Sequence, residues 1–256
     1  MRNPLFIMLL GYLILSTRAV AQSTALPLLS QGDGQFSLSL QGGLARHTIH
    51  QDRNDLHAFI ARPALGLRKR LDIYGLVGLV RQRIQYAESS FTEFKSGLDL
   101  LVGGGISWKT PGHLPGSLSL FLVSQAQVFF PRGKSHEILN LEKETLRKIR
   151  QTQYTWLQLQ ASLFAVKRLA CIDVFAGPVI TGQKITYQVH IGLEQNQTVV
   201  PVNQLSGRYD SRTYLQASAG FNAHLPGAYQ LGVQIRAGSL NNFALFVGLS
   251  QTGWLD

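Results

Sequence analysis

The feature of this sequence that most constrains its fold is a side-chain pattern with a period of two. Between Phe36 and Ala45, apolar residues alternate with small or polar residues. Successive side chains of a β-strand point to opposite faces of a sheet, whereas those of a helix repeat about every 3.6 residues. The alternation returns in residues 118–130, 157–165, 215–225 and 229–236. The pattern predicts an all-β protein.

Ten segments with this pattern are separated by Pro, Gly and charged residues, which are typical of turns. We expect strands at residues 35–47, 55–68, 71–86, 94–109, 116–130, 151–168, 171–189, 211–225, 228–238 and 242–251. The links after the second, fourth, sixth and eighth segments are short, while those after the first, third, fifth and seventh are longer. This change in link length predicts a single antiparallel up-and-down sheet with its short turns on one side.

The lengths of these segments favour strands that cross a membrane. A transmembrane strand takes about 9–11 residues, and such barrels have short periplasmic turns and longer extracellular loops. Closure into a barrel also pairs every strand edge, because hydrocarbon offers no hydrogen-bonding partner. A water-soluble β-sandwich alternates in the same way, but its strands are usually only about five or six residues long. We therefore expect a single transmembrane β-barrel of about ten strands, or of eight if the terminal segments lie outside it.

The N-terminus reads as a secretory signal. Arg2 precedes an apolar run from Leu5 to Leu15, and small residues stand at Ala19 and Ala21. The run is shorter than the roughly 20 residues that a spanning helix needs, so cleavage after Ala21 is expected. The predicted organisation is a signal peptide at 1–21, a periplasmic segment at 22–34 and a barrel at 35–256.

The signal, the hairpin PALGLRKRLDIYGLVGL and the strands LLVGGGISW and FALFVGLSQ resemble small porin-like families of bacterial outer-membrane β-barrel proteins. The resemblance implies an outer-membrane location and a structural or small-solute permeability role. Arg68, Lys69, Arg70 and Asp72 would then lie in a short periplasmic turn. Such barrels commonly end in an aromatic residue, whereas this chain ends TGWLD, so either Trp254 takes that place or the last strand is displaced.

Charged and amide side chains suggest which face of each strand points inward. On the strand at 71–86, the residues expected to face lipid are Tyr74, Leu76, Val80, Ile84 and Tyr86, and those expected to face inward are Arg81, Arg83 and Gln85. The whole set of inward-facing candidates is Arg62, Arg81, Arg83, Lys95, Asp99, Gln125, Gln158, Gln160, His224 and Arg236. These side chains could line a cation-rich lumen that favours anionic solutes, or they could form a packed polar core. The packed core is favoured, because narrow barrels are filled by side chains.

A second candidate site lies in the link RHTIHQDRNDLH, which would be an outer loop. Its residues of interest are His47, His50, Asp52, Asp55 and His57. Histidine with aspartate can act in general acid–base chemistry at a barrel rim or bind a transition metal. A solvated loop is the favoured interpretation, because nothing in the sequence fixes these residues in a catalytic geometry. The absence of a GxSxG, HExxH, GxxxxGK[ST] or paired CxxC motif weakens the enzyme hypothesis further. We therefore expect neither an enzyme nor a metal or other cofactor. The alternative functions are a rim hydrolase acting on lipid or peptide and a secreted soluble β-barrel.

The link PRGKSHEILNLEKETLRKIRQTQ has a helical pattern instead of a strand pattern. An apolar stripe would contain Ile138, Leu141, Leu146 and Ile149, surrounded by charged residues. A helix here could plug or cap the barrel, or hold lipopolysaccharide phosphates of the outer leaflet through Lys and Arg. A charged loop with a short helix is the other interpretation. Outer-membrane lipids are accordingly the predicted partners, and the sequence identifies no protein partner.

The chain is basic, with a formal charge of +10 that falls to +8 when Arg2 and Arg18 leave with the signal. The lysines and arginines are scattered among turns, strands and links without a recognition motif, so nucleic acid is not expected as a partner. Cys171 is the single cysteine, which excludes an intrachain disulfide.

Overall fold

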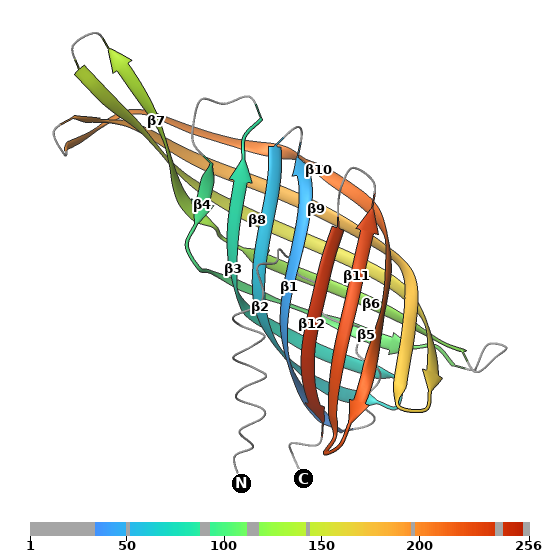
Figure 1. Cartoon of the computed structure of the whole chain (residues 1–256). Coiled ribbons are helices and arrows are strands. Elements are labelled where there is room, and N and C mark those ends of the chain that lie inside the picture. The colour runs from blue at the N-terminus through green and yellow to red at the C-terminus, as the bar shows by residue number, and fades with distance from the viewer. Residues whose placement is uncertain are drawn as a thin grey trace.

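The computed structural model describes residues 34–49, 52–87, 93–111, 118–141, 144–195, 198–238 and 243–252. Within these ranges there is no helix long and apolar enough to span a membrane. The described chain is almost entirely antiparallel β-structure (Figure 1). The strands are β1 Phe36–Ile49, β2 Asp52–Arg68, β3 Leu71–Gln85, β4 Phe94–Ser96, β5 Asp99–Lys109, β6 Leu118–Phe129, β7 Arg132–Leu141, β8 Glu144–Leu169, β9 Ile172–Gln195, β10 Thr198–Leu225, β11 Tyr229–Gly238 and β12 Phe243–Thr252.

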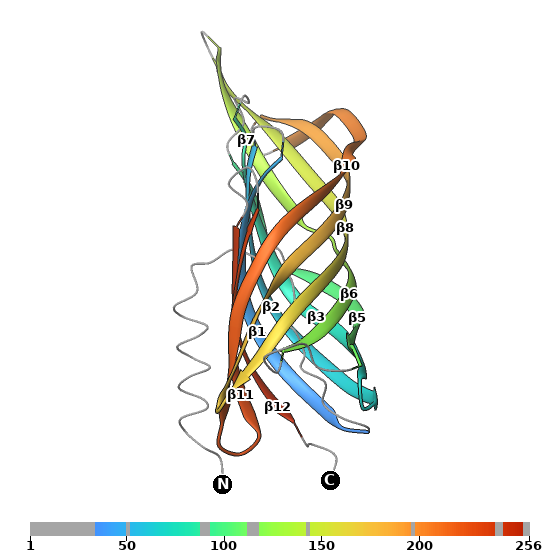
Figure 2. The ribbon, with the colours of Figure 1, turned by 90° about the vertical axis from the view of Figure 1, so that its right-hand side faces the viewer.

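Ten of these strands close into a ring, which confirms the predicted barrel and its strand number and shows that the alternative of eight is wrong. The ring runs through β1, β2, β3, β5, β6, β8, β9, β10, β11 and β12, and β12 pairs again with β1. Figures 1 and 2 show the strands inclined around the barrel. Ring closure pairs each ring strand on both sides, as a β-sheet in hydrocarbon requires, because lipid offers no hydrogen-bonding partner to the backbone.

Tight turns gather at one end of the barrel, which we call the short-turn end. They join β2 to β3, β8 to β9 and β10 to β11. Gly227 and Ala228 in the last turn both have positive φ, at 76° and 60°, the left-handed conformation of tight hairpin turns. The two described ends of the chain lie here as well, because Gly34 donates to the Gly66 carbonyl and Thr252 to the Ala228 carbonyl. Short turns together with both described ends of the chain on one side are the arrangement expected of a periplasmic end.

At the opposite end, β8, β9 and β10 continue beyond the ring. These three strands are 26, 24 and 28 residues long over their whole length. Together with β7 they form an external sheet, seen at the top of Figures 1 and 2. The helix predicted at 131–153 is therefore wrong, since β7 and β8 form a hairpin with Leu141 opposite Glu144. The ladder of β8 with β9 extends through this region, and such pairing overrides a local helical pattern.

Inward-facing positions of the ring are filled. The largest buried side chains of the barrel interior are aromatic, and Phe164 meets Phe175 edge to face at 5.6 Å between ring centroids. Nearly every second residue is buried along β3, from Asp72 to Ile84. Interiors of narrow barrels are usually closed in this way.

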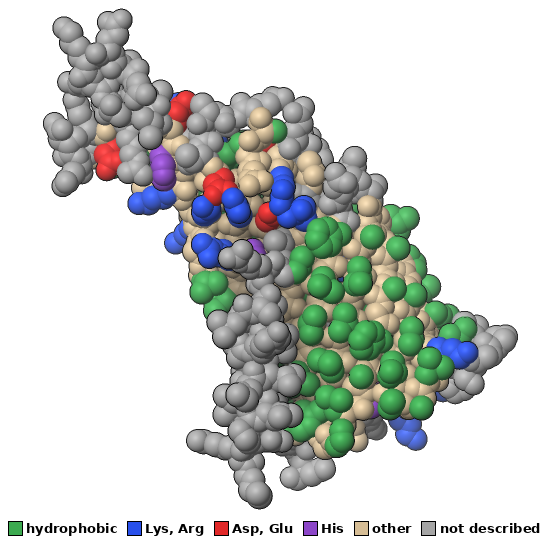
Figure 3. Space-filling model, viewed as in Figure 1, with side chains coloured by type: hydrophobic (Ala, Val, Ile, Leu, Met, Phe, Trp, Pro, Cys, Tyr) green, Lys and Arg blue, Asp and Glu red, His purple; other side chains and the backbone are tan. Residues whose placement is uncertain are grey.

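Outward-facing positions form an apolar belt. Exposed side chains of the belt include Phe59, Val77, Leu79, Leu100, Leu159, Ile180, Leu215 and Ile235. Leu215 is 66 % exposed and Val77 is 53 % exposed. Figure 3 shows such residues covering the barrel wall, with charged residues gathered above them. A continuous apolar surface of this kind is unfavourable in water and suits a lipid environment.

The predicted faces of β3 were wrong. Tyr74, Leu76, Val80 and Ile84 point into the barrel, whereas Ile73, Val77 and Leu79 point outward. Both faces of this strand are apolar through the membrane-facing part, so alternation alone does not decide between them. The interpretation relied on arginines facing inward, but Arg81 and Arg83 lie above the belt, where an outward charge meets water.

Candidate functional site

Two buried arginines mark the polar part of the barrel interior. Arg236 is 2 % exposed, and the amide oxygens of Gln160 and Gln234, when turned toward it, accept from its guanidinium. The same guanidinium lies over the Phe246 ring at 5.6 Å. Arg62 lies over the Tyr74 ring at 5.3 Å. Aromatic faces and amide oxygens are suitable partners for buried guanidinium groups.

A chain of side-chain hydrogen bonds links three strands inside the barrel. Tyr74 donates to Gln125 at 3.3 Å, Gln125 donates to Gln127 at 3.1 Å, and Gln127 donates to Gln158 at 2.6 Å. Gln125, Gln127 and Gln158 are all buried. These bonds join buried amide groups of neighbouring strands, so the polar residues form part of a packed core.

The structure places the predicted inward-facing set as follows. Inside the barrel are Arg62, Gln125, Gln158, Gln160 and Arg236. Asp99 is partly buried at the start of β5, and His224 lies at the short-turn end. The inward placement of Arg81, Arg83 and Lys95 was wrong, because all three are exposed on the outer face. Their strands extend beyond the belt, so their charges reach solvent without entering the lumen.

Sequence reasoning missed the aromatic residues that fill the interior. Trp156 has the same parity as Gln158 and Gln160 on β8, and Phe129 has the same parity as Gln125 and Gln127 on β6. This shared parity is the signal that could have identified them. The interpretation assigned apolar residues to lipid, although the inward face of a filled barrel carries polar and aromatic side chains together.

At the short-turn end, Asp173 accepts from two side chains. Its carboxylate is 2.5 Å from His224 Nε2 and 3.0 Å from Arg168 Nε. The backbone N–H of His224 donates to the Cys171 carbonyl at 2.7 Å. These contacts attach the turn between β8 and β9 to β10, which gives His224 a structural position at the barrel mouth.

The predicted rim loop is largely strand, since β1 and β2 continue through most of it. His50 and the side chain of His47 lie outside the described residues. Asp52 accepts from the Ala87 backbone N–H at 3.0 Å. Asp55 accepts from Arg46 at 2.9 Å and lies 3.3 Å from Arg53.

His57 and Asp55, both described at the rim, lie close to arginines. Burial, followed by the nearby Arg81 charge, lowers the pKa of His57. Arg46 and Arg53 hold the Asp55 carboxylate in ion pairs. Within the described ranges, no group of three or more His, Cys, Asp or Glu side chains is placed to hold a metal.

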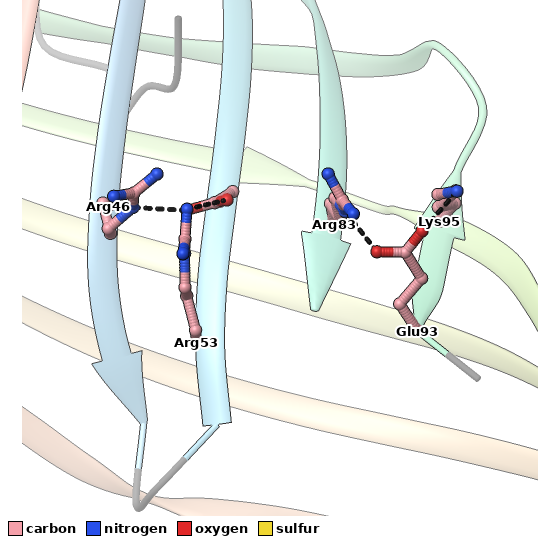
Figure 4. A network of polar contacts seen from close by, with 6 residues as sticks. Arg46, Arg53, Arg83, Glu93 and Lys95 are labelled. Carbon is pink, nitrogen blue, oxygen red and sulfur yellow. Dashed lines mark hydrogen bonds and ion pairs between the residues drawn. The ribbon is translucent and has the colours of Figure 1, made fainter. Parts of the chain in front are cut away.

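A charged band lies on the outer face, just above the apolar belt (Figure 3), and Figure 4 shows part of it from close by. We call it the collar, and its residues are Arg46, Arg53, Asp55, Arg81, Arg83, Glu93, Lys95 and Lys134. Strand register places five of them in one row, in the order Arg46, Asp55, Arg83, Lys95 and Lys134. Outward residues of a row are direct cross-strand neighbours.

Glu93 bridges two cations of the collar. Its carboxylate forms ion pairs with Lys95 and Arg83, as drawn in Figure 4. The hydrogen bond from the Lys95 ammonium, together with Arg83, lowers the pKa of Glu93. The carboxylate therefore stays ionised and keeps the two cations side by side.

A hollow of about 630 Å³ adjoins the collar where β4, β7, β8 and β9 meet. The charged and polar side chains that line it include those of Lys95, Arg132, Lys134, Gln151, Gln153 and His190. Lys134 lies opposite Gln151, and Gln151 lies opposite His190, so the hollow continues the row of the collar across the sheet. Its donors and positive charges suit an anionic group.

No protein-family model matches the chain. No curated protein sequence matches it. Solved structures that resemble it include the translocator domain of the autotransporter NalP from Neisseria meningitidis, at 11 % identity and a TM-score of 0.48, covering 96 % of this chain and 95 % of that one.

The transport unit of the autotransporter AIDA-I from Escherichia coli has 12 % identity and a TM-score of 0.42, with 94 % and 96 % covered. An outer membrane channel from Pseudomonas putida F1 has 9 % identity and a TM-score of 0.36, with 91 % and 100 % covered. All three TM-scores lie below 0.5.

Proposed function

We propose that the protein is an integral outer-membrane β-barrel with a structural role and a closed interior. The observation that carries the proposal is the burial of inward-facing residues around the ring. On β8, every second residue from Thr152 to Val166 is buried, and on β1 the same holds from Ser37 to Ala45. Side chains that line a water-filled channel would be accessible to water instead.

The composition of the interior supports the same proposal. Aromatic rings fill the space between the walls, and Trp156, Phe129 and Phe246 are all at most 2 % exposed. Gln125, Gln127 and Gln158 hydrogen-bond in series, so neighbouring side chains meet part of the hydrogen-bonding capacity of the interior. A small-solute channel would need these side chains to move together.

The structural role that we propose is to hold the external sheet above the membrane. β10 pairs with β11 only from Gln216 to Leu225, and its preceding residues pair with β9 beyond the ring. A membrane crossing takes about 9–11 residues, so much of this strand of 28 residues stands outside. The barrel is thus an anchor for a rigid sheet on the cell surface.

The experiment is a comparison of unboiled and boiled gel samples of the outer-membrane fraction, followed by single-channel recording of the purified protein. We expect a folded, heat-shifted band and no stepwise conductance, with a known general porin in the same bilayers as the positive control. Regular conductance steps from the folded protein would overturn the closed interior and establish a permeability role. Recovery of the protein in the aqueous fraction without a heat shift would overturn the membrane placement.

A further inference from the structure

We propose that the collar and its hollow bind the phosphate groups of a lipid headgroup in the outer leaflet. The proposal rests on the outer-membrane placement proposed above and adds a ligand and a site to it. Three observations support it: the collar has an excess of positive charge, this charge lies just above the apolar belt, and the adjoining hollow can take a polar group.

The collar has more cations than its carboxylates neutralise. Six arginines and lysines face two carboxylates, which leaves an excess of four positive charges. Asp55 is shared by Arg46 and Arg53, and Glu93 is shared by Arg83 and Lys95, so each carboxylate leaves one charge of its pair uncompensated. Among the described residues, Arg81 and Lys134 form no ion pair at all.

The height of the collar fits the boundary between acyl chains and headgroups. Phe59 and Leu79 are cross-strand partners at the upper edge of the belt, and Asp55 and Arg83 are partners four residues further along. Four residues of a strand span about 13 Å, or about 10 Å along the barrel axis at the usual tilt. A lipid whose acyl chains cover the belt would therefore carry its headgroup phosphate at the level of the collar.

The chemistry of the site favours a phosphate on a bulky headgroup. Guanidinium groups donate paired hydrogen bonds to phosphate oxygens, and ammonium groups supply concentrated charge. The hollow adds Arg132 and the polar side chains of Gln151, Gln153 and His190. Its volume of about 630 Å³ has room for a sugar phosphate. Continuity with the apolar belt favours a lipid over a soluble anion or an acidic protein.

The test uses the full-length mature protein folded in detergent and native mass spectrometry to count bound lipids. The probe is a diglucosamine lipid with a phosphate on each sugar, and the comparison is the same lipid without phosphates. We expect the phosphorylated lipid to bind saturably and at least about tenfold more tightly, as charge-assisted hydrogen bonds imply. Inorganic phosphate at equal concentration should not displace it.

Matched variants locate the site. The double substitution Lys95→Gln and Lys134→Gln should weaken binding about tenfold, whereas Glu93→Gln should strengthen it by removing a competing carboxylate. Lys167→Gln removes an exposed outward cation near the short-turn end and should leave binding unchanged. The heat-shifted band establishes that each variant is folded.

Equal binding of the phosphate-free lipid would overturn the proposal, as would unchanged binding by the Lys95/Lys134 double variant. Displacement by inorganic phosphate would identify a free-anion site and overturn the lipid assignment. None of these outcomes depends on conductance, so the closed interior and the lipid site can fail separately.

Discussion

The Trp156 indole stacks on the Phe129 ring across the pair β6–β8, with centroids 5.4 Å apart and planes inclined by 14°. Both rings are buried inside the barrel. Trp156→Ala should therefore lower the free energy of unfolding by about 3–5 kcal/mol, since it removes a large side chain and leaves a cavity. Urea titration of the heat-shifted band in lipid vesicles measures this loss.

Leu157→Ala is the control for that substitution, because Leu157 is the next residue on β8 and faces outward. Lipid can fill the space that this change leaves, so its cost should be clearly smaller. Equal losses for the two variants would contradict a packed interior.

Asp173→Ala should destabilise the short-turn end by about 1–2 kcal/mol, because the buried carboxylate accepts from both Arg168 and His224. The expected loss of stability is modest because the Arg168 side chain is largely exposed and can be solvated by water once the ion pair is gone. Arg168→Gln should cost less, since His224 remains in contact with Asp173. Unfolding midpoints of the two variants in the same vesicles give the comparison, and a larger loss for Arg168→Gln would contradict it.

Gly177→Ala should disrupt the pairing of β8 with β9. A Cβ atom at this inward position would collide with the Leu163 backbone carbonyl, which cannot move aside as a flexible side chain can. Gly182→Ala on the same strand is the matched control, because the nearest atom to its Cβ would be 4.0 Å away. We expect a reduced yield of heat-shifted protein for the first variant and a normal yield for the second.

The pKa of Glu93 should lie below its ordinary value of 4.5, because the Lys95 hydrogen bond and Arg83 favour the carboxylate. The stabilisation from these ion pairs is present above the unfolded-state pKa and is lost as the pH falls through the lower folded-state pKa. NMR titration of the ¹³C-labelled carboxyl group measures the shift. Lys95→Gln should return the pKa part of the way toward 4.5, and an unchanged value would contradict the ion pair.

The pKa of His57 should lie below 6.5, since burial and then the Arg81 charge disfavour the protonated ring. Arg81→Gln should raise this pKa while leaving the effect of burial in place. NMR titration of the imidazole signals measures the change, with Lys167→Gln as the distant control. A fall in the pKa on removing Arg81 would contradict the assigned charge effect.

The ring of ten strands could be predicted because each strand carries its own alternation and turn residues, as in the segment from Phe36 to Ala45. The sequence did not allow us to predict which face of β3 turns into the barrel. Between Ile73 and Val80 both faces are apolar, and only the pairing of β3 with β2 and β5 fixes which face turns inward.

The external hairpin shows the same limit for a different physical reason. Residues 132–153 combine charged residues with an apolar stripe, which favours a helix when the segment is considered alone. In the fold, the part of β8 in this region is paired with β9 on one side. The ladder continues outward, and β7 completes it on the other side, so tertiary pairing decides the conformation.

The candidate interior could be predicted in part. Arg62 and Arg236 were placed inward together with the other polar candidates, whereas Trp156 and Phe129 were not identified as interior residues. The collar was not predicted as a unit, because its row joins residues from five strands and exists only once the register is known.

From Thr198 to Gln216, β10 runs about 18 residues before its first partner on β11, which is roughly 60 Å along the strand. In a cell envelope this places the outer ends of β9 and β10, which form the tip of this hairpin, well clear of the lipid surface. A bacteriophage tail or an antibody approaching the cell would meet the tip before the barrel wall. Peptides inserted at that hairpin would be presented at a distance, which makes the fold a scaffold for surface display.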